Sequence, residues 1–467
     1  MLRLVRRACG PLAWAMTLSL AGAMPVLAQP DHRARERAIL AELIEIDTGP
    51  TGKATTEAAE AMARHLVAAG LPADDVRVIS VVPGIGNLVA RYRGTGAGGR
   101  PILLMAHLDV VEALREDWSF APFEFRERDG YYYGRGSSDN KAGIATLIST
   151  IIRYREEGFV PSRDLIIVLT GDEETSGDSI RLLLEQHRDL VDAEFALNTD
   201  AGGGELRDGR PIAFSVQTAE KVYLSFALEV RDDGGHSSVP GPSNAIYRLA
   251  AGLTRLAGFA FPVRLNETTR TFFDRAAEHQ PADLARDMRA LAREDDAAAA
   301  SRLAAASPFY NATMRTTCVA TGLSGGHAEN ALPQLARAVI NCRMLPDDPA
   351  GEVEAALVRV LADPAITLSR IAPPVPSPAS PLRADVVGPI EALVAEMWPG
   401  AVVVPEMSTG ATDGAFTRNA GIPTYGVSAV FGALDDIRAH GRDERIGVEP
   451  YHRAAEFWYR LLKRLAS

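Results

Sequence analysis

The sequence predicts an α/β protein with a three-layer main domain into which a smaller α/β domain is inserted. Short apolar runs such as RPILLMAHLDV (100–110) and DLIIVLT (164–170) alternate with helical patterns, which is typical of a buried sheet covered by helices. From about Lys221 the pattern changes to alternating strands around a long helical segment, and strand–helix alternation resumes after Pro346. The chain of 467 residues is long enough for two domains, since single cores stop growing at roughly 250–300 residues.

The elements of the main domain follow from local patterns. Helical periodicity opens the domain, and the second helix ends at a glycine, as helices often do. Strands and helices then alternate over 29–219 and 346–467. Helices are expected at 33–46, 55–70, 141–155, 178–188, 351–361, 385–397 and 450–465. Strands are expected at 76–82, 86–93, 100–110, 164–170, 193–200, 211–218, 401–406 and 421–429, with a hairpin at 129–130.

The inserted domain is expected at residues 220–345. VYLSFALEVR (222–231) alternates apolar and polar residues as a half-buried strand does. A helix (243–256) and a long Ala/Arg/Asp-rich helix (281–305) follow, and two strands (312–323 and 335–345) complete the domain.

The first 28 residues predict a secretory signal peptide. Three arginines precede an apolar stretch (12–24), and a small-residue cleavage site ends at Ala28, which is the arrangement of a cleaved export signal. The apolar stretch is shorter than the roughly 20 residues that a spanning helix needs, so a retained anchor is the less favoured alternative. We expect a periplasmic or secreted protein without stable membrane insertion.

Charge and cysteine content limit the possible partners. The net charge is −11 and no lysine/arginine cluster is present, so neither nucleic acid nor an anionic membrane is an expected partner. Cys318 and Cys342 are the two cysteines outside the predicted signal. Two cysteines can pair in an exported protein but make no disulfide framework. We expect them to stay unpaired and leave one bond as the alternative.

Metal-ligating side chains follow several strands at their ends, where open α/β sheets place their sites. Nitrogen and oxygen ligands without cysteine suit Zn²⁺ or a related divalent ion, and a pair of ions needs a carboxylate that both share. Adjacent glutamates can divide the work between a ligand and a general base. The residues concerned are His107 and Asp109 in HLD, Asp139 in GRGSSDNKAG, Glu173 and Glu174, Asp200, and His440 in a late loop.

These segments, taken in order, resemble the M20 family of dinuclear zinc peptidases and aminoacylases over almost the whole mature chain. The long helical segment and NATMRTT (311–317) narrow the resemblance to the secreted carboxypeptidase and N-acyl-amino-acid hydrolase branch. The matching motifs are MAHLDVV (105–111), GRGSSDNKAG (134–143), TGDEETSG (170–177), NTDAG (198–202), GGHSSVP (234–240), ENALP (329–333), CRMLP (342–346), STGATDGAF (408–416) and HGRDERI (440–446).

The resemblance implies a zinc-peptidase-like main domain that holds two Zn²⁺ per chain, for which Co²⁺ or Mn²⁺ can substitute. Asp139 would bridge the two ions. His107 and Asp200 would complete one ligand set, and Glu174 and His440 the other.

Two further roles near the metals follow from the resemblance. Glu173 would be the general base that moves a proton from water to the leaving amine. Asp109 would orient and polarise His107.

The inserted domain resembles the family's lid, through which many members form homodimers. His236 would reach the partner's site and stabilise the oxyanion of the tetrahedral intermediate. Arg343 would hold a substrate carboxylate with its bidentate fork. Asn330 would lie close to that carboxylate, and Gly410 would belong to a loop that lines the substrate.

The implied reaction is hydrolysis of an amide bond next to a free carboxylate. The motifs leave three substrates open: a peptide cut at its C-terminal residue, a dipeptide, or an N-acyl amino acid. An exported binding protein without turnover is a remote alternative, and the presence of Glu173 beside Glu174 argues against it, because a binder has no use for a free base.

Overall fold

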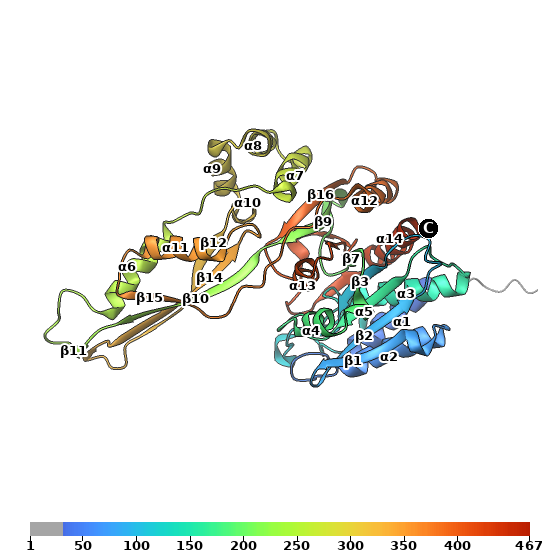
Figure 1. The fold of residues 1–467 in the computed structure, drawn as a ribbon, viewed down its shortest axis with the longest axis horizontal. Coiled ribbons are helices and arrows are strands. Elements are labelled where there is room, and N and C mark those ends of the chain that lie inside the picture. The colour runs from blue at the N-terminus through green and yellow to red at the C-terminus, as the bar shows by residue number, and fades with distance from the viewer. Residues whose placement is uncertain (1–30) are drawn as a thin grey trace, which may run out of the picture.

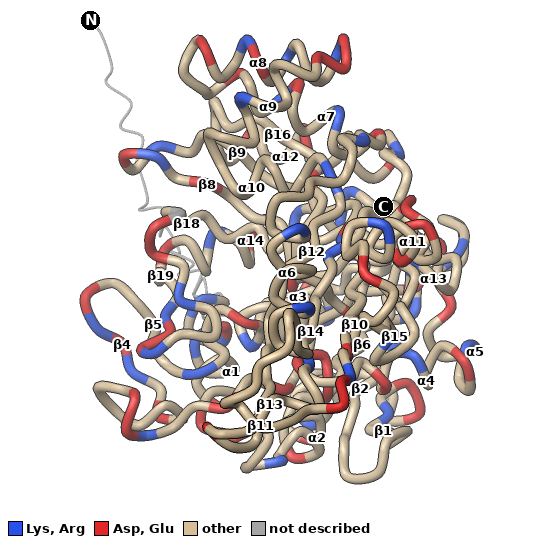
Figure 2. The backbone as a smooth tube through the Cα atoms, turned by 90° about the vertical axis from the view of Figure 1, so that its left-hand side faces the viewer, with Lys and Arg blue, Asp and Glu red and all other residues tan. Residues whose placement is uncertain are grey.

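The computed structural model describes residues 31–467, and the predicted signal peptide lies outside this range. Figure 1 shows a main body that contains the large sheet and an elongated arm that carries a second sheet and ends at β11. Within 31–467, no helix is both long enough and apolar enough to cross a bilayer. Figure 2 shows lysine and arginine scattered among aspartate and glutamate along the backbone.

The main sheet has ten strands, and its central strands are the continuous apolar runs of the sequence. β3 pairs in parallel with both β6 and β7, and every residue of β3 and β6 is buried. The strand order is β1 (Val76–Val82), β2 (Ile85–Tyr92), β6 (Leu165–Thr170), β3 (Ile102–His107), β7 (Phe195–Asn198), β17 (Thr424–Gly426), β9 (Arg210–Glu220), β8 (Gly203–Arg207) and β18 (Phe431–Ala433), with β16 (Val402–Ser408) also paired to β9.

Helices cover both faces of this sheet. Ile102 and Leu104 pack into one core, which includes residues of the first helical layer, whereas Leu103 and Met105 pack into a core on the opposite face. The predicted three-layer fold is therefore confirmed. The first layer contains α1 (His32–Glu45), α2 (Thr55–Ala68), α3 (Lys141–Glu157), α12 (Ala384–Met397) and α14 (Val448–Leu465), and the second contains α4 (Asp178–Gln186), α5 (Arg188–Val191) and α13 (Gly414–Asn419).

The arm is built on a four-stranded antiparallel sheet. Its strand order is β12 (Thr317–Gly325), β14 (Leu335–Met344), β10 (Val222–Arg231) and β15 (Ile366–Arg370), and α6 (Ala245–Ala257) and α11 (Ala350–Leu361) share its core. A short pair, β11 (Gly235–His236) with β13 (Ala331–Leu332), extends from it.

Residues 350–370 pack with the arm. The sequence analysis placed them in the main domain, but β15 pairs with β10, and Val353 and Leu357 of α11 are buried in the core of the arm. Pro346 follows a strand end and does not mark a change of domain. The division into domains stays a proposal, and we place the second boundary near residue 371.

The helical segment expected at 281–305 is two helices. α8 (Ala282–Glu294) ends where Asp295 adopts a left-handed conformation, with φ 53°. Asp296 then caps α9 (Ala297–Ala306) by accepting hydrogen bonds from the amides of Ala298 and Ala299. With α7 (Glu267–Ala276) and α10 (Pro308–Met314) they form a core that includes Val404 of β16.

The expectation that Cys318 and Cys342 stay unpaired is wrong. The two residues are direct partners in the register of β12 and β14, and they form a disulfide. Strand register brings the sulfurs together, and sequence spacing alone does not reveal that register.

Candidate metal and catalytic site

Parallel strands bring the predicted ligands to one edge of the main sheet. His107 ends β3, Glu173 and Glu174 follow β6, and Asp200 follows β7. Carboxyl ends of neighbouring parallel strands lie at the same edge, so residues far apart in sequence meet there. His440 joins them because β19 (Arg445–Gly447) pairs with β5 (Tyr131–Tyr133), which brings the loop before β19 against the loop after β5.

The first ligand group centres on His107. Its Nε2 lies 3.0 Å from Asp139 Oδ1 and 3.4 Å from Asp200 Oδ1. Its Nδ1 lies 3.0 Å from the carbonyl oxygen of Asp109, which can only accept a hydrogen bond. Nδ1 therefore carries the proton in a neutral imidazole, and Nε2 faces two carboxylates with its lone pair. A cation between these three atoms satisfies all of them.

The second ligand group shares Asp139 with the first. His440 Nε2 lies 3.1 Å from Asp139 Oδ2 and 3.0 Å from Glu174 Oε1. Asp139 thus directs one carboxylate oxygen to each histidine. The five side chains predicted as metal ligands all come together, in groups whose ligand atoms lie within 4.8 Å of one another.

Asp109 makes contacts that differ from those expected. Its carboxylate lies 3.7 Å from His107 Nδ1, beyond hydrogen-bond distance, and the backbone carbonyl orients the ring instead. The carboxylate accepts hydrogen bonds from the amides of Glu173 and Glu174, at 3.1 and 2.9 Å. Asp109 therefore fixes the backbone of the glutamate pair as well as the imidazole.

The loop that carries Asp139 is organised by Glu444, which the sequence analysis did not single out. The Glu444 carboxylate is fully buried. Its Oε2 accepts from Arg135 Nη1 at 2.7 Å and from the Gly136 amide at 2.9 Å. Its Oε1 accepts from the amide and hydroxyl of Ser138, both at 2.8 Å, and from the Asp139 amide at 3.1 Å. Glu444 lies in HGRDERI, but no local pattern indicates these contacts.

Crowding of carboxyl groups perturbs ionisation at the site. Burial, with the nearby charge of Asp200, raises the pKa of Glu173 to about 10. Burial and Asp139 raise the pKa of Glu174 to about 7. Burial also raises the pKa of Asp200 to about 6. In the absence of a cation the acids hold protons to limit their repulsion, and bound divalent ions would replace those protons.

The shared carboxylate and the histidines shift in the complementary direction. Burial opposes ionisation of Asp139, but hydrogen bonds from His107 and His440 outweigh it and lower the Asp139 pKa. The hydrogen bond to Asp139, together with Glu174, raises the pKa of His440 to about 9. Protonated imidazoles thus offset the carboxylates where cations would otherwise do so.

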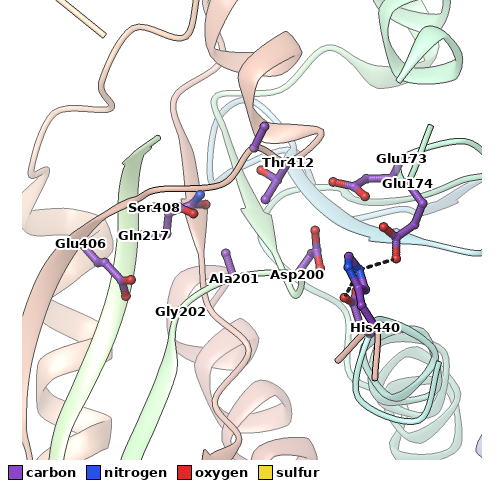
Figure 3. Close-up of a pocket in the computed structure, with 12 residues that line it drawn as sticks. Glu173, Glu174, Asp200, Ala201, Gly202, Gln217, Glu406, Ser408, Thr412 and His440 are labelled. Atoms are coloured by element: carbon purple, nitrogen blue, oxygen red, sulfur yellow. Dashed lines mark hydrogen bonds and ion pairs between the residues drawn. The ribbon is translucent and has the colours of Figure 1, made fainter. Parts of the chain in front are cut away.

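A cavity of about 250 Å³ opens beside these ligands. Figure 3 shows His440, Glu174 and Glu173 at one end and Glu406 at the other. Of the described residues that line it, none is a lysine or arginine; they are Asp139, Glu173, Glu174, Asp200, Ala201, Gly202, Gln217, Glu406, Ser408, Ala411, Thr412 and His440.

The predicted substrate residues do not all reach this cavity. His236 is exposed on β11, at the far end of the arm in Figure 1, and the Asn330 carbonyl accepts a hydrogen bond from the Ser237 amide beside it. Arg343 lies on β14 and stacks over the Tyr223 ring, 4.7 Å from its centroid. The structure does not bring these three to the cavity of the same chain.

The loop predicted to line the substrate does reach the cavity. Gly410 itself is not among the lining residues, but the next two residues, Ala411 and Thr412, are. The Gly410 amide donates to Ser408 Oγ at 3.0 Å, which holds the loop against the end of β16. Gln217 and Glu406, on β9 and β16, were not predicted.

The fold has three layers, with a mixed sheet between helices, and histidine and carboxylate side chains gather around a shared aspartate at the strand ends. This combination defines a class of metal-dependent hydrolases. The profile of peptidase family M20/M25/M40 matches residues 103–464, and the chain belongs to this family. It is a peptidase or amidohydrolase, as the sequence motifs predict.

Two relatives illustrate the branch. The human N-fatty-acyl-amino acid synthase/hydrolase PM20D1 is 30% identical over 383 residues, which cover 79% of this chain and 75% of that protein. The probable carboxypeptidase S-like 2 of Dictyostelium discoideum is 28% identical over 390 residues, or 81% and 74% of the two chains.

Solved structures support the fold. An M20 family metallo-carboxypeptidase, Sso-CP2 from Sulfolobus solfataricus, superposes with a TM-score of 0.66 at 20% identity. The match covers 92% of this chain and 99% of that one.

Proposed function

We propose that this protein is an exported zinc-dependent hydrolase that cleaves an amide bond next to a free carboxylate, acting on peptides as a carboxypeptidase. One observation carries the proposal: Asp139 lies between two histidine–carboxylate groups, and the separate carboxyl group of Glu173 lines the same cavity. Amino-acid amidohydrolase and dipeptidase activities are the alternatives, and the names of the relatives above favour the first of them.

The residues fit two Zn²⁺ ions. His107, Asp139 and Asp200 would hold one ion, and Asp139, Glu174 and His440 the other. The donors are imidazole nitrogen and carboxylate oxygen, which zinc accepts readily, and His107 Nε2 lies close to carboxylate oxygens of both Asp139 and Asp200. When bound, the two ions supply Lewis acidity and lower the pKa of a water molecule.

Glu173 is the proposed general base. Its side chain makes no hydrogen bond or ion pair with the described residues, while Asp109 holds its amide in place. Its pKa is raised to about 10, first by burial and then by Asp200, and nearby cations would lower that value and leave an ionised base. Glu173 takes a proton from the attacking water and delivers it to the leaving amine.

Substrate recognition requires residues from outside the cavity. Among the described residues, no lysine or arginine lines the cavity. Arg343 can therefore bind a substrate carboxylate only if the arm moves toward the cavity or if a second chain supplies this arginine. His236, Asn330 and Arg343 all belong to the arm, which is consistent with the roles proposed for them in oxyanion stabilisation and carboxylate binding.

A homodimer through the arm is part of the proposal. β12 is an edge strand of its sheet, and Val319 and Leu323 on it are 60% and 71% exposed. Tyr247 of α6 is 66% exposed. An exposed apolar edge strand is a template for pairing with another chain.

Export to the periplasm or the medium rests on the predicted signal at residues 1–28. The Cys318–Cys342 disulfide supports it, because disulfides form and persist mainly in oxidising compartments.

The test is turnover by purified, zinc-loaded protein against peptides, dipeptides and N-acyl amino acids, followed by identification of the released amino acid. We expect release of a C-terminal amino acid from at least one class. Tight binding of these compounds without turnover would contradict the proposal and favour a binding protein.

A further inference from the structure

The end of the cavity remote from the metal ligands contains a second polar group. Glu406 of β16 and Gln217 of β9 are partners in a parallel register, so their side chains lie on the same face of the sheet. Figure 3 shows the Glu406 carboxylate on the opposite side of Asp200 from His440. Ala201, Gly202 and Ala411 also line the cavity, and these small side chains leave room for a narrow ligand.

Among the residues of 31–467 whose side chains are described, the Glu406 carboxylate has no cationic partner, and the hydroxyl of Ser215 on β9 is the hydrogen-bond donor beside it. Two other donors in the cavity lining, on Gln217 and Thr412, are used by Glu220. Glu220 Oε2 accepts from Gln217 Nε2 at 3.1 Å and from Thr412 Oγ1 at 3.0 Å, and it lies 2.7 Å from Arg418 Nη2. Among the described residues, Glu406 therefore has one hydroxyl donor and no cation beside it, and its remaining acceptor positions are open to a ligand or water.

The charge of the cavity determines which ligand suits that acceptor. Asp139, Glu173, Glu174 and Asp200 carry the four carboxylates at the metal end of the lining, and two divalent ions would balance them. Of the described residues that line the cavity, Glu406 is then the one carboxyl group without a compensating positive charge. Burial raises its pKa, which is the expected consequence of a carboxyl group without a cationic partner.

The same charge decides which half of the substrate lies beside Glu406. Like charges facing each other across an interface disfavour binding. The half of the substrate that carries the free carboxylate is therefore directed away from Glu406, and the acyl half lies along β9 and β16. The cavity of about 250 Å³ is below the range of about 300–1,000 Å³ typical of drug-sized ligands, so the acyl half is small.

We propose that Glu406 forms a subsite for a hydrogen-bond donor on the acyl half of the substrate, above all a protonated amine. The substrate class is then an unblocked dipeptide or a similar aminoacyl amino acid, in preference to an amino acid that carries a hydrocarbon acyl chain. This inference rests on the proposed function, because it specifies which amides the same site cleaves.

The test compares acyl groups of equal size that differ in one charged group. Zinc-loaded protein is assayed with glycyl-, β-alanyl-, 4-aminobutanoyl- and 6-aminohexanoyl-leucine, and with the propanoyl, butanoyl, pentanoyl and heptanoyl compounds in which a methyl group replaces the amine. We expect kcat/KM for at least one amine to exceed that of its methyl counterpart by about tenfold or more, as a charge-assisted hydrogen bond provides.

The variant Glu406→Gln keeps the size of the side chain and removes its charge. We expect it to reduce the preference for the amine to less than about threefold and to leave kcat/KM for the methyl compounds within about threefold of the unaltered protein. The matched control is Glu391→Gln. Glu391 lies on α12 in an ion pair with Arg275 and does not line the cavity, so the preference should persist.

The outcomes separate this inference from the proposed function. Cleavage of both series without preference, a preference for the methyl compounds, or a preference that survives in Glu406→Gln would overturn the subsite and leave the hydrolase intact. Absence of cleavage of any amide, including longer peptides, would refute the proposed function and the subsite together.

Discussion

Replacement of Glu444 by glutamine should destabilise the protein and weaken zinc binding, although Glu444 is not a predicted ligand. A glutamine retains one acceptor oxygen and presents an amide nitrogen in place of the other. That nitrogen has to face either Arg135 and Gly136 or Ser138 and Asp139, and all four supply donors to the carboxylate. At least two donors therefore lose their acceptor in a site without solvent.

The magnitude follows from the burial of the pair. The side chains of Arg135 and Glu444 are 3% and 0% exposed, so solvent screening is slight. Removing one partner of a buried ion pair costs about 3–5 kcal/mol, a large part of the roughly 5–15 kcal/mol that stabilises a typical domain. Either orientation removes the acceptor of at least one backbone amide in the loop that carries Asp139, so the shared carboxylate should also become mobile and the zinc affinity should fall.

The assay is urea unfolding of zinc-loaded protein, with zinc content measured by mass spectrometry after dialysis. The matched control is Asp443→Asn, one position earlier, whose carboxylate accepts from the amide and hydroxyl of Ser119 nearer the surface. We expect the control to cost less than about 1 kcal/mol. A loss of less than about 1 kcal/mol in Glu444→Gln, with zinc content unchanged, would refute the reasoning.

Three further predictions concern the base, the metal and the dimer. Glu173→Ala should lower kcat by about 100-fold or more with two zinc ions still bound; substantial residual turnover would reject it as the base. The hydrogen bond to Asp139 raises the pKa of His440 to about 9 in the metal-free protein, whereas the pKa of an unfolded histidine is about 6.5. Protonated His440 therefore stabilises the metal-free fold fully below pH 6.5, and this stabilisation is lost as the pH rises through 9. Zinc requires the neutral ring, so calorimetry should detect proton release between these values and tighter binding at higher pH, and an affinity that does not change from pH 6 to 9 would contradict this. Leu323→Glu should produce a monomer in light scattering. The control Val358→Glu, which alters a residue 57% exposed on α11, should leave the dimer intact. A dimer that survives Leu323→Glu would exclude the β12 edge as the dimer interface.

Local sequence patterns were sufficient for the central strands of the main sheet and for the proposed metal ligands, which the fold brings together. β3 and β6 are continuous apolar runs because parallel central strands are buried on both faces. His107 and Asp200 could be found because each follows such a strand. The ligand chemistry was also readable, since imidazole and carboxylate groups at strand ends indicate a divalent metal whatever the details of packing.

Local patterns failed where the outcome depends on pairing between distant segments. Residues 350–370 were grouped with the main domain, although they pack with the arm, because a helix and a strand look alike in either sheet until β15 is seen to pair with β10. The disulfide was missed for the same reason, because the register of β12 on β14 sets the distance between Cys318 and Cys342.

By itself, then, the sequence determined the central strands of the main sheet and the chemical type of the proposed metal ligands, because these depend on neighbours along the chain. Only the tertiary structure decided which polar groups are satisfied. Glu444 meets Arg135 across 309 positions, and Glu406 has no cationic partner among the described residues, since Arg418 pairs with Glu220. Hydrogen bonds of this kind depend on which side chains converge in space, and that convergence is set by the topology of the sheet.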